Sequence, residues 1–132
     1  MKILIVGCGR VGAMVATALS KAGHQVTVID SQRQAFDRLG SDFNGEMVLG
    51  NGIDEDVLRR AGIENADGFA SLTNGDNRNI MAAQIAREIF KVPRVITRIY
   101  DPIREDVFRE LGLHTVSPTL SGARQIHEML KG

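Results

Sequence analysis

The sequence predicts an α/β fold in which helices cover both faces of a doubly wound, parallel, six-stranded sheet. Short apolar runs typical of buried strands alternate with segments of helical periodicity along all 132 residues. The loops between these segments are short, as they are where βα units connect parallel strands. The length suits one domain and is too short for two of similar size.

The first elements follow from local signals. Residues 3–6 and 26–29 form mostly apolar, mostly β-branched runs, so buried parallel strands are expected at 2–6 and 25–30. Residues 11–21 carry apolar side chains at helical spacing, and this helix should end before Gly23, a typical C-cap residue. Ser31, with a glutamine three residues later, resembles a capping box and predicts a short helix.

The later elements repeat the pattern. Strands are expected at 46–49, 68–72, 94–99 and 113–116. Asp54 is the expected cap of one helix, and residues 77–90 form another with a broad apolar face. The last two helices should begin at Asp101-Pro102 and Ser117-Pro118, where proline occupies the first helical position.

The first βα unit contains a glycine motif. Gly7, Gly9 and Gly12 match G-x-G-x-x-G between a strand and a helix, which is the context of a Rossmann-type fold. Gly7 permits a tight turn, Gly9 lets the backbone approach a phosphate, and Gly12 lets helix and strand pack closely. The free N–H groups at the start of the helix then face the anion.

Asp30 ends the second strand, eighteen residues after Gly12. A carboxylate at this place accepts hydrogen bonds from the 2′- and 3′-hydroxyls of a ribose. The expected ligand is therefore NAD(H) or an adenine nucleotide (ATP, ADP or AMP) and not NADP, whose 2′-phosphate would meet the carboxylate. A glycine-rich turn without a ligand is the alternative, and strand, glycines, helix and acid in one unit argue against it.

Three further loops follow strands at the same edge of the sheet, where such folds bind ligands. Their side chains are short hydrogen-bonding groups that suit an adenosine and its ribose. The candidate contacts in these loops are Ser31, Asn51, Gly52, Leu72, Thr73 and Asn74. Taken alone, Gly50-Asn51-Gly52 is explained as well by an ordinary turn, and Thr73-Asn74 by a helix cap.

The amino-acid composition argues against several classes of function. Sixteen basic and sixteen acidic side chains give a net charge of zero, which argues against a nucleic-acid partner. The single Cys8 forms no internal disulfide and indicates a reducing compartment. With no leader and no apolar run of membrane-spanning length, a cytoplasmic protein is expected, connected to a membrane only through a partner. Three scattered histidines give no metal site, and no catalytic residues are predicted, so the chain is not expected to be an enzyme.

Several segments between Met1 and about Pro118 are similar to segments of a known protein family. They read V-G-C-G-R-V-G, V-T-V-I-D, G-N-G-I-D-E-D-V-L, L-T-N-G-D-N-R-N-I and I-T-R-I-Y-D-P. With these segments the chain resembles the nucleotide-binding domain of the regulators of potassium conductance, the RCK, KTN or TrkA-N-like domains. These include the cytosolic subunits of the Trk and Ktr potassium uptake systems.

The resemblance implies a regulatory subunit that gates a membrane potassium transporter or channel when it binds NAD(H) or ATP/ADP. It assigns phosphate, ribose, adenine and loop contacts to Gly7, Gly9, Arg10, Val11, Gly12, Asp30, Asn51, Thr73, Asn74 and Arg98. Gly52-Ile53 replaces the family's usual Ala-Thr next to the adenine. The competing interpretation is the cofactor-binding domain of an NAD-dependent oxidoreductase.

The resemblance also implies an assembly. Residues 1–132 would form one RCK N-terminal domain, in which residues 117–132 form a crossover helix that packs on a neighbouring subunit. A homodimer would result, and two or four such dimers could form a tetrameric or octameric ring beneath the transporter. Arg10 is either a solvent-exposed helix residue or a contact to a terminal phosphate across a subunit boundary.

Overall fold

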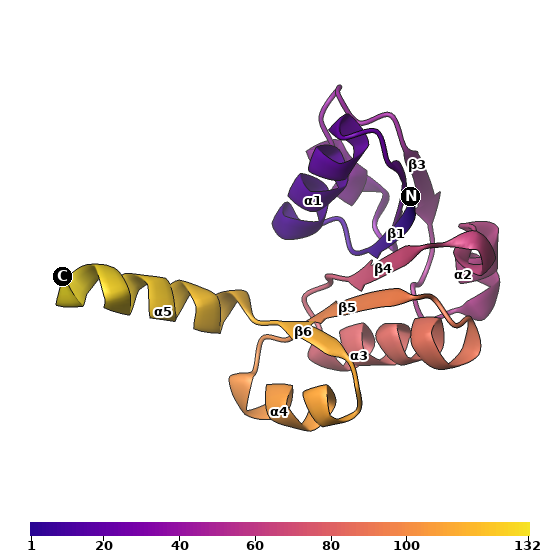
Figure 1. The fold of residues 1–132 in the computed structure, drawn as a ribbon. Helices are drawn as coiled ribbons and strands as arrows, with labels where there is room; N and C mark the ends of the chain where they lie inside the picture. Colours follow the sequence, from indigo (N-terminus) through magenta and orange to yellow (C-terminus); the bar gives the residue numbers. More distant parts are fainter.

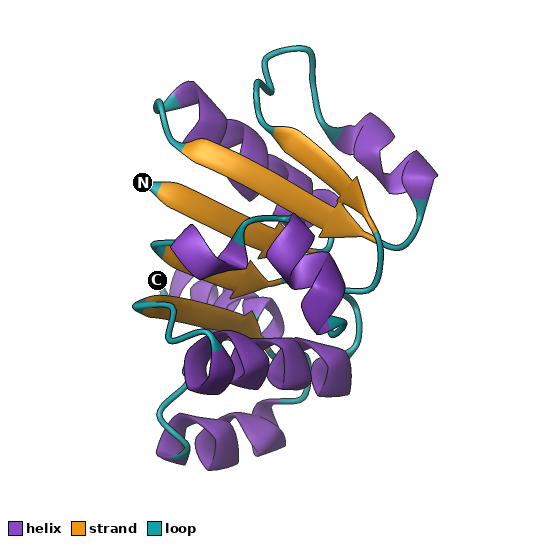
Figure 2. Ribbon diagram, turned by 90° about the vertical axis from the view of Figure 1, so that its right-hand side faces the viewer, coloured by secondary structure: helices purple, strands orange, loops and turns teal.

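The computed structural model describes the backbone of residues 1–132 and all side chains except those of 102 and 103. Six strands form one sheet in the order β3-β2-β1-β4-β5-β6, and every neighbouring pair is parallel. The strands are β1 (Lys2–Val6), β2 (Gln25–Asp30), β3 (Glu46–Leu49), β4 (Gly68–Ser71), β5 (Arg94–Arg98) and β6 (His114–Val116). Figure 2 shows the strands running side by side with helices in front of and behind them. The predicted doubly wound, Rossmann-like sheet is confirmed.

The helices alternate with the strands. They are α1 (Arg10–Lys21), the 3₁₀ helix η1 (Arg33–Arg38), α2 (Glu55–Arg60), the 3₁₀ helix η2 (Ile63–Asn65), α3 (Asp76–Gln84), the π-helix η3 (Ile85–Ile89), α4 (Pro102–Glu110) and α5 (Pro118–Lys131). Asp54 caps α2, since its Oδ1 accepts from the backbone N–H groups of Asp56 and Val57. Ser117 caps α5 by accepting from the N–H of Leu120.

Two expectations about helices are wrong in detail. The hydroxyl of Ser31 makes no capping contact: η1 begins after Gln32, whose N–H is bound by Asp30 instead. The helix expected over 77–90 begins at Asp76 and changes to a π-helix after Gln84. Apolar residues three and four apart suit both helix types, so their spacing does not reveal the change.

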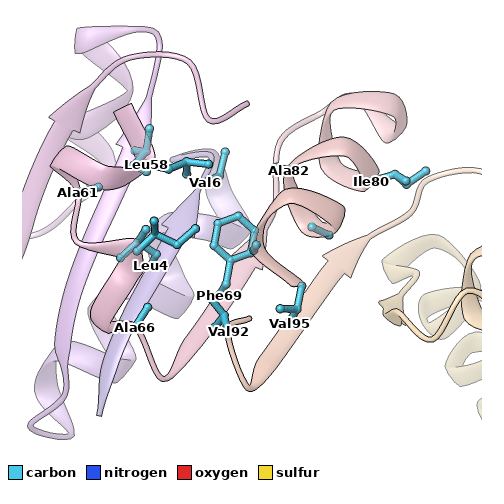
Figure 3. Close-up of a cluster of buried hydrophobic side chains, with 14 of the residues drawn as sticks. Leu4, Val6, Leu58, Ala61, Ala66, Phe69, Ile80, Ala82, Val92 and Val95 are labelled. Carbon is cyan, nitrogen blue, oxygen red and sulfur yellow. The ribbon is translucent and has the colours of Figure 1, made fainter. Parts of the chain in front are cut away.

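Each face of the sheet has its own apolar core, because alternate residues of a strand point to opposite faces. Leu4, Val6 and Phe69 face a cluster built with α2 and α3, and Figure 3 shows Phe69 with Leu4 on one side and Val95 on the other. Ile3 and Ile5 face the second cluster, which α1 and η1 cover. Together the two cores hold the carboxyl ends of β1, β2, β4 and β5 at one edge of the sheet.

The last helix lies outside both cores. Figure 1 shows α5 extending away from the sheet after β6, and none of its residues is buried. On the sheet, Ile96 of β5 and Val116 of β6 are 41% and 47% exposed. These two apolar side chains of the sheet are therefore only partly covered, while α5 exposes Ile126, Met129 and Leu130.

Candidate functional site

A cavity of about 840 Å³ lies at the carboxyl edge of the sheet, between the loops that follow β1, β2, β3 and β4. Strand order reverses between β1 and β4, and this switch point is where open α/β sheets bind ligands. Of the predicted site residues, those lining the cavity are Gly7, Gly9, Arg10, Val11, Asp30, Ser31, Asn51, Gly52, Ile53, Leu72, Thr73, Asn74 and Arg98. Gly12 lies behind this surface.

The three glycines of the motif have different surroundings. Gly7 has φ +105°, and a Cβ there would lie 2.8 Å from the backbone of Leu72 and Thr73. A Cβ on Gly12 would overlap the carbonyl oxygen of Gly7, so the first turn of α1 packs directly on the loop. Gly9 has no atom within 4 Å of such a Cβ, and it lines the cavity. The fold thus requires glycine at positions 7 and 12, whereas position 9 is open toward the cavity.

Asp30 joins the loops after β1 and β2. One carboxylate oxygen accepts from the N–H of Cys8 at 2.8 Å, and the other accepts from the N–H of Gln32 at 2.8 Å. Each carboxylate oxygen can accept more than one hydrogen bond, so a pair of hydroxyls in the cavity could still donate to Asp30. The carboxylate is fixed in place at the β2 end of the cavity.

Arg38 and Cys8 complete this end. The guanidinium of Arg38, at the end of η1, donates to the carbonyl of Cys8 at 3.3 Å and lines the cavity. The Cys8 side chain is fully buried, and burial, with a smaller contribution from the Asp30 charge, raises the pKa of its thiol to about 11. The thiol therefore stays protonated at neutral pH and is a poor nucleophile.

A buried amide organises the β4 side of the cavity. Asn79 of α3 is completely buried; its Oδ1 accepts from the N–H and hydroxyl of Thr73, and its Nδ2 donates to the carbonyls of Thr73 and Arg98. The Ser71 hydroxyl, also buried, donates to the backbone carbonyl of Asn79 and accepts from the Thr97 hydroxyl. The Thr73 side chain thus binds α3, and Gly75, not Thr73 or Asn74, is the N-cap of that helix.

Arg98 lies at the β5 end of the cavity with an unsatisfied donor. Its Nε is buried and is the unpartnered buried side-chain atom found among the described residues. Its guanidinium carbon lies 4.2 Å from the centroid of the Tyr100 ring, a cation–π contact. A buried donor without an acceptor costs about 1–3 kcal/mol. An anionic or carbonyl oxygen of a ligand would remove that cost.

Steric contact explains why glycine stands at position 52, where the family usually has alanine. A Cβ on this residue would overlap a methyl group of Val6, a buried side chain of β1. A branched, buried valine cannot move aside easily, so Ala does not fit here while Val6 is present.

Gly52→Ala is expected to lower the free energy of unfolding by about 1–3 kcal/mol, since overpacking costs that much. Combined with Val6→Ala, it should cost at least about 1 kcal/mol less than the sum of the single changes. Urea unfolding of the four proteins measures this, with Gly122→Ala as the control because no atom lies within 4 Å of that position. Additive effects of the two changes would contradict the steric explanation.

Sequence reasoning missed several residues of the cavity. Gln32, Gln34 and Arg38 line it, although they stand outside the recognised motifs. Arg78 and Tyr100 also line it; they lie within segments that carry the family resemblance, but no ligand contact was assigned to them. Asn79 could have been identified from the sequence as a buried polar residue, because it is a polar residue on the apolar face of a predicted helix. Among the described side chains no three His, Cys, Asp or Glu residues gather into a group that could hold a metal ion.

The strand order, the glycine loop and the acid after β2 define a Rossmann-like domain of the class that binds nucleotides at this edge. The family model described as the TrkA-N domain matches residues 3–118, and the chain belongs to this family. The resemblance to RCK domains is thereby confirmed, and the RCK domain of GsuK is a structural neighbour with 27% identity.

Three relatives are similar over most of the chain. The Trk system potassium uptake protein TrkA of Streptomyces coelicolor is 54% identical over 117 residues, which cover 89% of this chain and 52% of that protein. The TrkA-N domain of the Escherichia coli inner membrane protein ybaL has 25% identity and a TM-score of 0.85, covering 98% of this chain and 96% of that one. GsuK bound to ADP has 27% identity and a TM-score of 0.82, covering 98% and 33%. The chain thus spans about half the length of curated relatives such as the Streptomyces protein.

Proposed function

We propose that this chain is the nucleotide-binding domain of a regulatory subunit that gates a membrane potassium transporter or channel. The observation that carries the proposal is the cavity at the switch point, which is lined by the open Gly9, the fixed carboxylate of Asp30 and Arg98 with its unpartnered Nε. Membership in the TrkA-N family, whose curated relatives include Trk potassium uptake proteins, supports the link to potassium transport.

The residues present fit a nucleotide. Asp30 would accept from ribose hydroxyls, Asn51 and Ile53 would lie against the adenine, and the N–H groups at the start of α1 would bind the diphosphate. Arg98 would donate its free N–H to the ligand. The ADP bound to GsuK, a neighbour at 27% identity, supports an adenine nucleotide here, and NAD(H) offers the same ribose and diphosphate.

The competing function is that of a cofactor domain in an NAD-dependent oxidoreductase. The glycine loop and Asp30 suit this function equally well, so the cavity alone does not distinguish a regulatory subunit from an oxidoreductase. The relatives' names, which refer to potassium uptake by the Trk system, favour the role in potassium transport. None of the helices among the described residues is long and apolar enough to span a bilayer. We propose that the protein is cytoplasmic and reaches the inner face of the membrane through its transporter partner.

Two separate apolar surfaces support a homo-oligomer. One consists of α5 and the uncovered face of β5 and β6, where Ile96 and Val116 are exposed. The other comprises Met81 of α3, Ile89 of η3, Val107 of α4 and Leu111, which follows α4; these side chains are between 48% and 58% exposed. A dimer would use one such surface, and a closed ring of dimers would use both.

Asp30 should make the site reject NADP. A 2′-phosphate would approach a carboxylate that two backbone N–H groups hold in place, so NADP is expected to bind more weakly than NAD(H). Asp30→Ala should weaken NAD(H) and ADP binding by about 1–3 kcal/mol, because charge-assisted hydrogen bonds are lost. Calorimetric titration measures both effects, and equal affinities of the wild type for NADP and NAD would contradict the ribose assignment.

The proposed function itself is tested in two steps. Thermal unfolding with NADH, ATP, ADP and AMP identifies ligands, because a ligand that binds the native state raises Tm. Potassium uptake is then measured in cells that lack the protein and receive either the wild type or a variant that cannot bind. Uptake that responds equally to both proteins would overturn the regulatory role, and turnover of NAD(H) with a second substrate would favour the oxidoreductase.

A further inference from the structure

The first turn of α3 contacts both loops on the β4–β5 side of the cavity. Asp76 and Asn79 are three residues apart in this turn, so their side chains lie on the same face of the helix. Neither is among the described residues that line the nucleotide cavity. They can therefore influence a ligand without touching it, through the residues that they hold.

The carboxamide of Asn79 makes every hydrogen bond that it can make. A carboxamide has two acceptor positions on its oxygen and two donors on its nitrogen. In Asn79 the acceptors bind the N–H and the hydroxyl of Thr73, and the donors bind the carbonyls of Thr73 and Arg98, at distances between 2.6 and 3.0 Å. Since Thr73 and Arg98 both line the cavity, this buried side chain fixes two parts of its wall relative to each other.

Asp76 holds the residues that follow Arg98. Its two carboxylate oxygens accept from the N–H of Tyr100 at 2.7 Å and from the N–H of Asp101 at 3.0 Å. The centroid of the Tyr100 ring in turn lies 4.2 Å from the guanidinium carbon of Arg98. The backbone of Arg98 is thus fixed by Asn79, and its guanidinium lies against a ring whose own backbone is fixed by Asp76.

The negative charge of Asp76 allows its role to be measured by the sign of an effect. The residue lines a small hollow of about 440 Å³ that shares Asn74, Arg78 and Tyr100 with the cavity. By charge alone, a carboxylate there opposes the binding of an anionic nucleotide, so its removal should strengthen binding. By position, its removal frees Tyr100 and Arg98, and binding then has to order a long side chain, which lowers affinity.

We infer that Asp76 and Asn79 are positioning residues, which hold the Arg98 side chain in place for the ligand and raise nucleotide affinity without contacting the nucleotide. The inference rests on the proposed function, since it concerns how the same site is held. An arginine whose rotamers are restricted before binding loses less conformational freedom when a ligand binds. The first turn of α3 therefore contributes to affinity through the order that it imposes on Arg98.

Calorimetric titration with ADP tests the inference, at a temperature well below the Tm of each protein. Asp76→Ala and Asn79→Ala should each weaken ADP binding by about tenfold, because the cavity wall loses its order. Two control variants should change the affinity by less than about twofold. Ser71→Ala removes a buried hydroxyl that bonds the α3 backbone and Thr97, and Asp56→Ala removes an exposed acid from the first turn of α2.

A double-mutant cycle with Arg98→Ala shows whether the effect passes through that side chain. In the Arg98→Ala background, Asp76→Ala should weaken ADP binding by no more than about twofold, because the side chain that it orders is gone. An equal loss in both backgrounds would overturn the role of Asp76, and so would an Asp76→Ala variant that binds ADP as tightly as the wild type or more tightly. Asp76→Ala carries the test even if Asn79→Ala does not fold, since Asp76 is half-buried and Asn79 is fully buried.

Failure of this inference is distinguishable from failure of the proposed function. If the wild type binds neither ADP nor ATP, AMP or NADH, the nucleotide site itself is wrong, and the inference is overturned with it. If the wild type binds ADP and both variants bind it equally well, the nucleotide site remains and only the positioning role of Asp76 and Asn79 is overturned.

Discussion

Gly9→Ala is expected to fold, with a loss of stability of no more than about 1 kcal/mol because alanine is a poorer N-cap of α1 than glycine, and to lose nucleotide binding. No atom of the protein lies within 4 Å of a Cβ at this position, so the methyl group meets only the space of the cavity. In the proposed site that space is where the diphosphate approaches the backbone, and a methyl group there prevents contact with the N–H groups of α1. Thermal unfolding with and without ADP measures both properties in one experiment.

Gly12→Ala is the informative contrast, because it should have the opposite effect. Its Cβ would overlap the carbonyl oxygen of Gly7, so α1 must move away from the loop at a cost of about 3 kcal/mol. Far-ultraviolet circular dichroism and urea unfolding should show a weakened fold even without a ligand. If Gly9→Ala keeps the ADP-induced rise in Tm, the phosphate does not bind at this loop.

The different effects expected of substitutions at Gly9 and Gly12 illustrate what a motif predicts and what it does not. The spacing of Gly7, Gly9 and Gly12 predicted the turn, the open position and the close packing, because all three act within one βα unit. The strands were likewise predicted to within about one residue, since buried parallel strands are continuous apolar runs. Their order in the sheet depends on contacts between distant segments, and no local pattern encodes it.

The same distinction applies to the cavity. Asp30 and Asn51 stand at strand ends and could be placed from the sequence alone. Arg38 reaches the cavity from η1, at a place in the sequence that carries no motif, and Arg78 reaches it from α3, within a segment to which no ligand contact by arginine was assigned. Thr73 was expected either to cap a helix or to contact the ligand; it is not the cap, it lines the cavity, and its hydroxyl binds the buried Asn79. Such pairings depend on tertiary structure, so only the class of site was predictable and not its full composition.

Removal of α5 is expected to convert an oligomer into a monomer. Its exposed side chains Ile126, Met129 and Leu130 are spaced three and four apart, so they lie on one face of the helix, between 60% and 82% exposed. The helix extends away from its own sheet in Figure 1, and Ile96 and Val116 on that sheet are only partly covered by the described part of the same chain. A second copy can supply the missing cover, with α5 of each subunit on the sheet of the other in a two-fold dimer.

Light scattering after size exclusion, at tens of micromolar, measures the mass of the 132-residue chain and of a form lacking residues 118–132. The first should be at least dimeric and the second monomeric. Ile126→Ser with Leu130→Ser should dissociate the oligomer, whereas Arg124→Ser with Lys131→Ser, on the opposite face of the helix, should not. A monomeric 132-residue chain would refute the crossover. An oligomer that survives the deletion would place the interface on other exposed apolar side chains, such as Met81, Ile89, Val107 and Leu111, because these offer a further means of association.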